Sequence, residues 1–331
     1  MVDQPSAALS DTVDALLEAT VAGSFSSTGI AVRRRLARWA PYDRLDGRVV
    51  VLTGGTSGIG AAAVVELARL GATVHLVGRD RSRAEAVRDR AEAAAPGTTT
   101  FTLADLGDPA DVRRLAASLA DRYGRIDVLI HNAGALSTTY RRAPDGTEST
   151  VAVQVLAPFL LTGLLRHRLG TDGDAGPSRV LTVTSGGMYG QRFDLDRLEQ
   201  SEPDYHGVTA YARAKRAQVV LTGEWSRRAP VTEVVAHAMH PGWVDTPGLG
   251  SGLPGFHRLM GPLLRTPAQG ADTLVWLAGC ADAVRSGGDL WLDRRRRSPY
   301  HLPWTWTPPA RRIADGADLW AWCEGHADWA P

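Results

Sequence analysis

The sequence predicts an α/β fold in which a doubly wound parallel sheet carries helices on both faces. Between Arg48 and Asp293, seven short runs rich in β-branched residues alternate with longer stretches of helical periodicity. The short runs are mostly continuous apolar runs without strict alternation, which is typical of strands buried on both faces. The chain of 331 residues is therefore expected to contain one domain, residues 47–293. A helical extension (1–46) precedes it, and a tryptophan-rich extension (294–331) follows it.

The expected strands and helices follow one another along this domain. The strand candidates are Val49–Thr53, Thr73–Val77, Thr99–Ala104, Val128–His131, Arg179–Thr184, Val234–Met239 and Asp289–Leu292. The helix candidates are Ser57–Leu70, Arg83–Ala95, Pro109–Tyr123, Thr147–Arg168, Tyr211–Arg228 and Pro267–Ala278. In the extensions, helices are expected around Asp11–Ala22 and Ile30–Trp39. The basic run Arg294–Arg297 is expected to be a solvated turn.

The composition excludes several classes of protein. Lys and Arg total 37 against 36 Asp and Glu, so a net charge of +1 creates no field that would recruit nucleic acid. Two cysteines cannot form a disulfide framework, and no apolar run approaches the roughly 20 residues of a membrane-spanning helix. His237 and His240 would face opposite sides of a strand, so no metal site is expected. We therefore expect a cytoplasmic protein.

A glycine-rich turn joins the first expected strand to the first expected helix. It has the sequence Thr53-Gly54-Gly55-Thr56-Ser57-Gly58-Ile59-Gly60. Glycines allow a tight turn and let the backbone approach a pyrophosphate at the helix N-terminus. Because the turn lies between a strand and a helix, it favours nucleotide binding over a flexible loop.

The end of the second strand indicates which nucleotide is bound. NAD-selective sites usually place a carboxylate here, where it accepts hydrogen bonds from the ribose hydroxyls. Gly78 offers none, whereas the guanidinium of Arg79 can pair with a 2′-phosphate. The sequence therefore favours NADP(H). NAD(H) remains the alternative if Arg79 is only a surface arginine.

Two polar residues stand four positions apart on the helix expected from Tyr211. Lys215 is the only lysine of the chain, and Tyr211 lies one turn before it, on the same helix face. A phenol with a pKa near ~10 exchanges protons poorly at neutral pH. A nearby ammonium stabilises the phenolate and lowers that pKa. A surface contact is the alternative for such a pair, but the unique lysine favours catalysis.

Several separated motifs together resemble the short-chain dehydrogenase/reductase family, over about Gly47 to Leu292. They are the glycine turn, Asp105-Leu106, Asn132-Ala133-Gly134, Ser185, Tyr211-x-x-x-Lys215, and Pro241-Gly242 with Thr246. The resemblance implies a Rossmann-type fold and an NAD(P)-dependent oxidoreductase that acts on CH-OH or C=O groups. Further segments, such as 218–222 and 269–273, are most similar to the branch called dehydrogenase/reductase family member 12.

The resemblance also implies a role for individual residues. Tyr211 donates a proton in carbonyl reduction and accepts one in alcohol oxidation, Lys215 holds the nicotinamide ribose, and Ser185 hydrogen-bonds the substrate oxygen. Asn132, the only asparagine, is expected to brace the loop under the cofactor. The residues expected to bind the cofactor are Thr53, Gly54, Ser57, Gly58, Ile59, Gly60, Arg79, Asp105, Leu106, Asn132, Ala133, Gly134, Tyr211, Lys215, Pro241, Gly242, Val244 and Thr246.

Gln154 departs from the family pattern, which has an asparagine at this point. In the family, the backbone carbonyl of that residue holds a water of a proton relay. In a regular helix the carbonyl of Gln154 would accept the N–H of residue 158, but Pro158 has none. We expect Pro158 to free this carbonyl, so that the relay survives. An incidental helix kink is the alternative.

Two segments are expected to shape the substrate site. Residues 186–210 separate Ser185 from Tyr211, a long spacing similar to that of the retinol dehydrogenase group. Residues 245–266 follow the sixth strand, where a mobile lid would lie. With these segments, Met188, Tyr189, Trp243 and Phe256 predict an apolar pocket for a ketone, an aldehyde or a secondary alcohol. Ordinary core packing is the alternative for each of them.

Other interpretations stay open. A non-catalytic NADP-binding redox sensor or scaffold would explain Gln154. The basic amphipathic segment 30–40 is expected to dock on the domain or on a second subunit, and contact with a membrane surface is the less favoured alternative. The family resemblance implies a homo-oligomer, although the two extensions offer a way to block its helix–helix interface.

Overall fold

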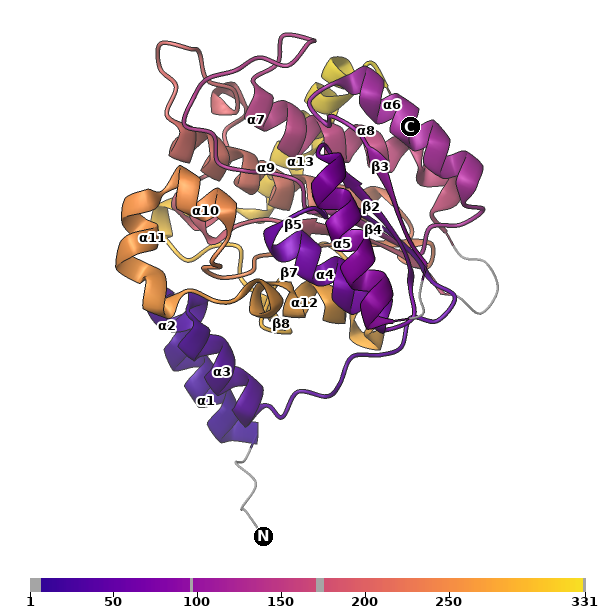
Figure 1. Cartoon of the computed structure of the whole chain (residues 1–331). Helices are drawn as coiled ribbons and strands as arrows, with labels where there is room; N and C mark the ends of the chain where they lie inside the picture. Colours follow the sequence, from indigo (N-terminus) through magenta and orange to yellow (C-terminus); the bar gives the residue numbers. More distant parts are fainter. Residues whose placement is uncertain (1–6, 96–97, 171–175, 330–331) are drawn as a thin grey trace.

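The computed structural model describes residues 7–95, 98–170 and 176–329. An eight-stranded sheet lies at its centre, with the order β3-β2-β1-β4-β5-β6-β7-β8 (Figure 1). The strands are β1 (Val49–Thr53), β2 (Thr73–Gly78), β3 (Thr99–Leu103), β4 (Val128–His131), β5 (Ser178–Val183), β6 (Val234–Met239), β7 (Leu290–Leu292) and β8 (Arg295–Arg297). Strands β1 to β7 run parallel, and β8 pairs antiparallel with β7. The predicted α/β class is confirmed, with β8 as an additional edge strand.

Helices cover both faces of this sheet (Figure 1). One face carries α4 (Gly58–Arg69), α5 (Arg81–Ala94) and α12 (Pro267–Gly279), and the other carries α6 (Pro109–Arg122), α8 (Ala157–Leu164) and α9 (Gly207–Arg228). Successive residues of a strand belong to different cores: Val51 packs in the core of α6, α8 and α9, whereas Val50 and Leu52 pack in the core of α4 and α12. Because both faces are covered, most positions of the central strands β1, β4 and β6 are apolar.

The helix predicted over Thr147–Arg168 is interrupted. In the structure it consists of α7 (Ser149–Val151), a π-helical turn (Ala152–Leu156), α8 and a 3₁₀ turn (Arg166–Arg168). Pro158 explains the interruption, because its ring displaces the preceding turn and it has no N–H to donate. The N–H of Ala157 bonds to the carbonyl of Ala152, five residues earlier.

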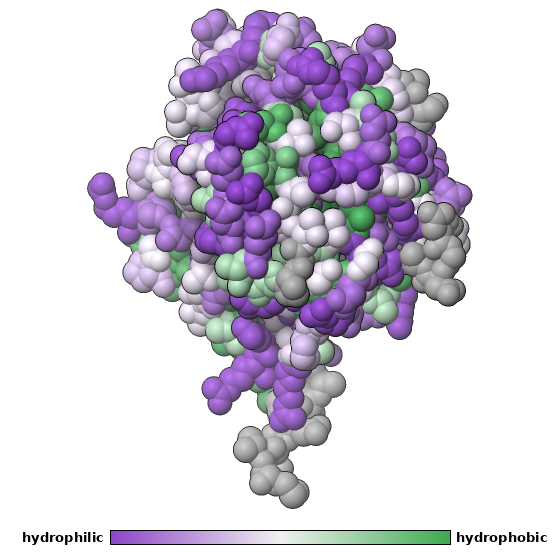
Figure 2. Space-filling model, turned by 45° about the vertical axis from the view of Figure 1, so that its right-hand side comes forward, coloured by the Kyte–Doolittle hydropathy of each residue, from purple (hydrophilic) through white to green (hydrophobic). Residues whose placement is uncertain are grey.

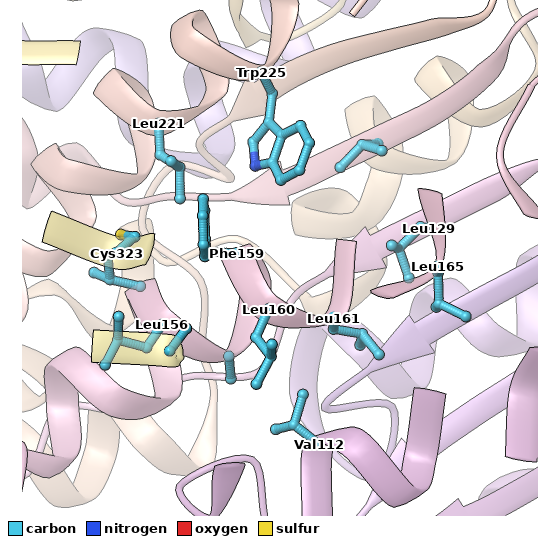
Figure 3. Packing of buried hydrophobic residues seen from close by; sticks show 14 of the residues in the cluster. Val112, Leu129, Leu156, Phe159, Leu160, Leu161, Leu165, Leu221, Trp225 and Cys323 are labelled. Atoms are coloured by element: carbon cyan, nitrogen blue, oxygen red, sulfur yellow. The ribbon is translucent and has the colours of Figure 1, made fainter. Parts of the chain in front are cut away.

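The C-terminal extension packs on the helical layer formed by α8 and α9. Its helix α13 (Pro309–Ala327) buries Trp320, whose ring lies 5.0 Å from that of Phe159 and 4.6 Å from that of Trp225, centroid to centroid. Figure 3 shows Phe159, Trp225 and Cys323 pointing into one apolar cluster. The tryptophan-rich tail is thus largely a cover for the core, although Trp304 and Trp306 stay exposed.

The N-terminal extension forms three helices that project from the body of the molecule, with a mainly hydrophilic visible surface (Figures 1 and 2). They are α1 (Ala7–Glu18), α2 (Val21–Phe25) and α3 (Ser27–Leu36). In α3, Arg34 and Arg35 are exposed, whereas Arg33 is buried and pairs with Asp14 and Asp293, at 2.7 Å each. Helix α3 therefore docks on the domain through a buried ion network.

The run Arg294–Arg297 is not the solvated turn that the sequence predicts. The turn lies one residue earlier, at Asp293 and Arg294, whose φ angles are 53° and 57°. Residues 295–297 then form β8. Arg297 is largely buried and donates two hydrogen bonds of 2.8 Å to Asp14 of α1. These contacts with a distant carboxylate draw the basic run into the sheet.

The remaining segments connect the sheet to the site. After β6, the chain forms two short helices, α10 (Pro247–Gly252) and α11 (Pro254–Met260). Short 3₁₀ turns complete the chain at Gly186–Gly190, Leu195–Arg197, Gly261–Leu263, Ala281–Val284 and Pro303–Thr305. Within the described ranges, no helix is both long and apolar enough to cross a bilayer.

Candidate active site

The predicted motifs meet at the carboxyl ends of β1, β4 and β5. The strand order reverses between β1 and β4, which are neighbours in the sheet, and ligands of open parallel sheets bind at such a switch point. The glycine turn follows β1, Asn132 follows β4, and Ser185 comes two residues after the end of β5. The fold therefore gathers these motifs at one edge of the sheet.

The glycine turn has the conformation that a close-lying ligand requires. Gly54 and Gly58 adopt φ angles of +71° and +52°, which favour glycine. A Cβ at Gly54 would lie 2.7 Å from the Cα of Ala133, and one at Gly60 would overlap the carbonyl of Gly54. Helix α4 starts directly after Ser57, whose side chain caps no backbone N–H. The helix N-terminus is thus left to a ligand.

Asn132 braces this turn from the neighbouring strand. Its side-chain amide donates to the carbonyl of Thr53 at 3.1 Å and to that of Gly54 at 2.9 Å. Its backbone N–H donates to the Thr53 hydroxyl at 3.1 Å. The side-chain contacts are the brace expected of the only asparagine, and they join β4 to the glycine turn.

The end of β2 leaves no room for an acidic side chain. A Cβ at Gly78 would overlap the methyl group of Thr56, which belongs to the glycine turn. Arg79 follows it, with an exposed side chain and no hydrogen bond or ion pair to any residue that the structure describes. Its guanidinium is therefore available to a ligand beside the glycine turn.

The other predicted cofactor residues lie around this cradle. The side chain of Thr246 abuts Gly58, where a Cβ would lie 3.1 Å from the threonine methyl. Val244 and Ile59 both pack against Gly270. Asp105 is exposed and caps its own turn by accepting the N–H of Gly107 at 2.9 Å. Leu106 is buried in the core, and Gly134 packs against the side chain of Gln154.

Ser185, Tyr211 and Lys215 form a connected group. The hydroxyls of Ser185 and Tyr211 are hydrogen-bonded to each other. The ammonium of Lys215 lies 5.4 Å from the centre of the Tyr211 ring and donates to the carbonyl of Val183 at 2.8 Å. Thr184 fixes α9 on β5, because its hydroxyl donates to the carbonyl of Lys215 at 2.7 Å. The spacing on α9 therefore does bring tyrosine, lysine and serine together.

Burial controls the protonation of this group. Burial raises the pKa of Tyr211, and the hydrogen bond with Ser185 partly opposes that rise. Burial also lowers the pKa of Lys215, to about 7. The expected lowering of the phenol pKa by the ammonium is absent, because Lys215 faces the tyrosine ring and bonds to Val183. The phenol is consequently protonated at neutral pH, as a proton donor must be.

The carbonyl of Gln154 is released from the helix but is not free. It accepts a hydrogen bond of 2.8 Å from the side-chain amide of Gln218 on α9. The sequence predicts the release by Pro158 correctly, but it does not predict this second partner. The side-chain amide of Gln154 donates to the carbonyl of Ala135 at 3.2 Å, so it braces the loop after β4.

The four residues predicted to line the substrate pocket divide into two pairs. Met188 and Tyr189 are buried in an apolar cluster, at 0% and 5% exposure, so they support the site from behind rather than line it. Trp243 and Phe256 are half-buried, and their rings meet at 5.2 Å in a T-shaped contact. Met188 and Tyr189 therefore correct the prediction, because apolar residues in the turn Gly186–Gly190 can equally pack in the core.

Segments from three parts of the chain surround the catalytic group. The loop after β4 meets α10, because a Cβ at Gly252 would lie 3.0 Å from the side chain of Leu136. The same loop meets the segment before α9, where the Tyr205 hydroxyl donates to the carbonyl of Ser137 at 3.2 Å. Phe25 of α2 was not predicted as part of this region, yet its ring lies 5.9 Å from that of Trp243.

These residues fit a nicotinamide dinucleotide. The glycine turn is a backbone cradle that side chains would fill, and it opens at a helix N-terminus suited to a pyrophosphate. Arg79 offers a free cation beside the cradle, and Tyr211 and Lys215 lie at the next strand ends. The described ranges contain no group of three or more histidine, cysteine or acidic residues that could hold a metal ion.

Comparison with known proteins identifies the family. The family model described as short chain dehydrogenase matches residues 48–252. The chain belongs to the short-chain dehydrogenase/reductase family and is an NAD(P)-dependent oxidoreductase that acts on a small molecule. It is 38% identical over 261 residues to dehydrogenase/reductase SDR family member 12 from Bos taurus, covering 78% of this chain and 80% of that protein. The predicted similarity to this branch is confirmed.

Two further relatives extend the comparison. A Streptomyces sp. (strain C5) protein, DnrU, provisionally named a daunorubicin C-13 ketoreductase, is 41% identical over 266 residues, covering 80% of this chain and 88% of that protein. Among solved structures, an uncharacterised protein from Mycobacterium paratuberculosis superimposes with a TM-score of 0.67 at 29% identity, covering 88% of this chain and 97% of that chain.

Proposed function

We propose that this protein is an NADP(H)-dependent oxidoreductase that transfers a hydride between the nicotinamide and an apolar ketone, aldehyde or secondary alcohol. The observation that carries the proposal is the grouping of Ser185, Tyr211 and Lys215 beside the glycine turn. A protonated phenol, a hydroxyl bonded to it and a buried cation are the groups that reduction of a carbonyl requires.

Each of these residues has a distinct part in the reaction. In the direction of reduction, Tyr211 donates its proton to the substrate oxygen, and the Ser185 hydroxyl holds that oxygen in place. When bound, the nicotinamide supplies or accepts the hydride at the carbon. Lys215 would hold the cofactor ribose, and the hydrogen bond with Ser185 stabilises the phenolate left on Tyr211. In the direction of oxidation, Tyr211 accepts the proton instead.

The preference for NADP(H) rests on the end of β2. A Cβ at position 78 would overlap the methyl group of Thr56, and Gly78 itself offers no carboxylate for the ribose hydroxyls. Arg79 has no partner among the described residues, and its planar guanidinium matches a 2′-phosphate. Both features support the phosphorylated cofactor.

The apolar substrate class rests on the partly exposed aromatic and aliphatic residues that follow β6. Trp243 and Phe256 pair their rings while remaining partly exposed. Helices α10 and α11, which carry Phe256, also expose Leu259, at 79%. Such surfaces favour an aromatic or aliphatic carbonyl compound over a charged one.

The proposal is tested with a panel of apolar ketones, aldehydes and secondary alcohols, with NADPH consumption or formation as the readout. We expect turnover with part of the panel. Tyr211→Phe should reduce turnover by at least about a thousandfold, because the proton donor is lost, while the Kd for NADPH changes less than about threefold. Turnover retained by Tyr211→Phe would contradict the mechanism.

A non-catalytic NADP-binding sensor is the second candidate. It is favoured by Gln154 and Gln218, because the amide of Gln218 occupies the carbonyl that a relay water would use. Tight binding of NADPH without turnover across the panel would support this candidate. An intact serine, tyrosine and lysine group favours the enzyme.

We also propose that the protein acts in the cytoplasm. Cys280 and Cys323 are free and buried, and burial raises the pKa of the Cys280 thiol to about 11, which keeps it unreactive. This cysteine chemistry suits a reducing compartment. Residues 30–40 serve docking on the domain rather than membrane contact, since Arg33 is engaged in the buried network.

A further inference from the structure

Phe25 lies at the end of α2, outside the part of the chain that matches the family model. Its side chain is 3% exposed, although α1 to α3 project from the body of the molecule (Figure 1). The ring lies 4.6 Å from that of His240, 5.9 Å from that of Trp243 and 6.1 Å from that of Tyr189, measured between centroids. The N-terminal extension therefore inserts an aromatic ring into the catalytic half of the domain.

Two glycines make room for this insertion. A Cβ at Gly186 would lie 2.5 Å from the Phe25 ring, and one at Gly242 would lie 2.6 Å from the carbonyl oxygen of Phe25. Gly186 directly follows the catalytic Ser185. Gly242 has a φ of +76° and directly precedes Trp243. Phe25 thus touches the chain next to the serine and next to an aromatic residue of the substrate side.

The backbone on either side of Phe25 is fastened to the same region. The N–H of Trp243 donates to the carbonyl of Phe25 at 2.9 Å. The guanidinium of Arg265 donates to the carbonyls of Phe25 at 3.0 Å and of Ser24 at 2.8 Å. Arg265 is itself 1% exposed and holds Asp293 through two hydrogen bonds, at 2.6 and 2.9 Å. A buried cation held this way has little freedom to move.

Arg265 also closes the base of the segment that contains α10 and α11. Its N–H donates to the carbonyl of Trp243 at 2.7 Å, and its carbonyl accepts the N–H of Asp245 at 2.9 Å. The substrate-side helices therefore leave and rejoin the body at one point, and that point is bonded to residues 24 and 25. Phe25 therefore contacts the chain at two points, at Gly186 next to Ser185 and at Trp243 where the α10–α11 segment begins.

We propose that Phe25 is a positioning residue of the active site, which sets the Ser185–Gly186 turn and Trp243 and so determines which carbonyl compounds reach Tyr211. This proposal rests on the proposed function. It assigns the N-terminal helices a part in specificity, where the sequence suggests only an extension. Because misplacing a catalytic group by about 1 Å can cost a hundredfold in rate, loss of the ring should affect kcat more than cofactor binding.

The first test compares Phe25→Ala with Ile30→Ala, which removes a similarly buried side chain (3% exposed) from α3. With 2-decanone and 2-butanone as probes, we expect Phe25→Ala to lower kcat/KM at least about tenfold and to change the ratio between the two ketones. The Kd for NADPH should stay within about twofold. Ile30→Ala should leave all three quantities within about twofold, and equal losses in both variants would overturn the proposal.

A double-mutant cycle with Gly186→Ala tests the contact itself. In the unmodified protein, the new methyl group would collide with the Phe25 ring and lower kcat/KM at least about tenfold. In the Phe25→Ala background the space is vacated, so the same change should cost less than about twofold. Additive losses would show that the ring does not act through this turn.

A third measurement separates this proposal from the proposed function. Hydrogen exchange should become faster in residues 184–190 and 241–247 of Phe25→Ala, and not in residues 53–60 or in Ile30→Ala. If the unmodified protein turns over no carbonyl compound while this pattern is seen, the proposed function fails and the positioning role stands. If exchange in both segments is unchanged, the positioning role fails.

Discussion

Lys215 is the residue whose environment differs most from that of an ordinary surface cation. It is 2% exposed, and burial lowers its pKa to about 7. The carbonyl of Val183 is an oriented dipole that accepts one of its protons. An arginine could not respond in this way, since its guanidinium stays charged at any physiological pH. The one lysine of the chain, unlike the arginines, can therefore gain or lose its charge near neutral pH.

We expect the affinity for NADPH to depend on pH through Lys215. Below about pH 7 the ammonium is already present in the free protein. Above that pH the free protein must take up a proton to offer a cation to the anionic cofactor, so the Kd should rise with pH, by at most about tenfold per unit. Fluorescence titration of NADPH between pH 6 and about 9 measures this dependence. In Lys215→Met binding should be weaker, and a rise that persists in this variant would exclude Lys215 as its source.

Arg79 governs the choice between the two cofactors. We expect the unmodified protein to bind NADPH more tightly than NADH, because an unpaired guanidinium beside the glycine turn can hold the 2′-phosphate. Arg79→Ala should weaken NADPH binding by about 2 kcal/mol, the value of a charge-assisted hydrogen bond, and leave NADH nearly unchanged. Arg90→Ala, which removes an exposed arginine farther along α5, is the matched control. Equal affinities for the two cofactors in the unmodified protein would refute the assignment.

At the scale of elements, the π-helical turn links the two helices that carry the site. Pro158 has no N–H to donate, the turn shifts to a wider register, and the carbonyl of Gln154 accepts a hydrogen bond from the side-chain amide of Gln218 on α9. A buried carbonyl left without a donor costs about 1–3 kcal/mol. Gln218 therefore stabilises the irregular turn and ties it to the helix of Tyr211.

Replacing Pro158 tests this link. Pro158→Ala restores an N–H that can donate to the carbonyl of Gln154 in a regular α-helix, in competition with Gln218. We expect kcat to fall several-fold, with little change in the Kd for NADPH. Pro309→Ala, at the start of α13 in the C-terminal extension, controls for the loss of a proline. An unchanged kcat in Pro158→Ala would remove the turn from the catalytic argument.

The seven parallel strands could be predicted because their pattern is local. Continuous β-branched runs mark strands buried on both faces, and the structure reproduces them within a few residues. Strand β8 could not be predicted, because three arginines have no strand pattern of their own. Their conformation depends on Asp14, more than 280 positions earlier in the chain. The ion pair with Asp14 holds residues 295–297 in a strand, whereas their composition alone predicts a solvated turn.

The site residues likewise divide into those that the local sequence predicts and those whose contacts depend on distant segments. Ser185, Tyr211 and Lys215 are brought together by strand ends and helix spacing, both of which the sequence displays. Phe25 and Gln218 were missed as site residues, because their contacts join distant segments. Gly186 and Gly242 were visible signals of a close approach, but a glycine does not reveal which residue approaches it.

At the scale of the whole molecule, the two extensions cover different parts of one domain. Asp14 of α1 pairs with Arg297 of β8, Phe25 of α2 contacts Trp243, and α13 lies over α8 and α9 (Figure 1). Phe159 and Trp225 are therefore shielded within the chain, at 0% and 8% exposure. The surface of α8 and α9 that α13 covers is therefore buried within this chain.

Removing the C-terminal extension should expose that surface. A variant ending at residue 302 lacks Trp320, so Phe159, Trp225 and their neighbours would face water, and apolar surface in contact with water favours association. Light scattering after size-exclusion chromatography should give a larger mass for the shortened chain than for the full chain. Changing the exposed Trp304 and Trp306 to serine should leave the mass unchanged. A shortened chain of unaltered mass would show that α13 does not block association.

The junction at Arg265 also constrains how this protein can be re-engineered. Its guanidinium donates hydrogen bonds to the carbonyls of Ser24, Phe25 and Pro241 and to the carboxylate of Asp293. A chimaera that takes only residues 245–265 from a relative would replace this arginine and lose its hydrogen bonds to the carbonyls of Ser24 and Phe25. A change of substrate preference by exchange of segments therefore requires residues 24–26 to be replaced together with residues 245–265.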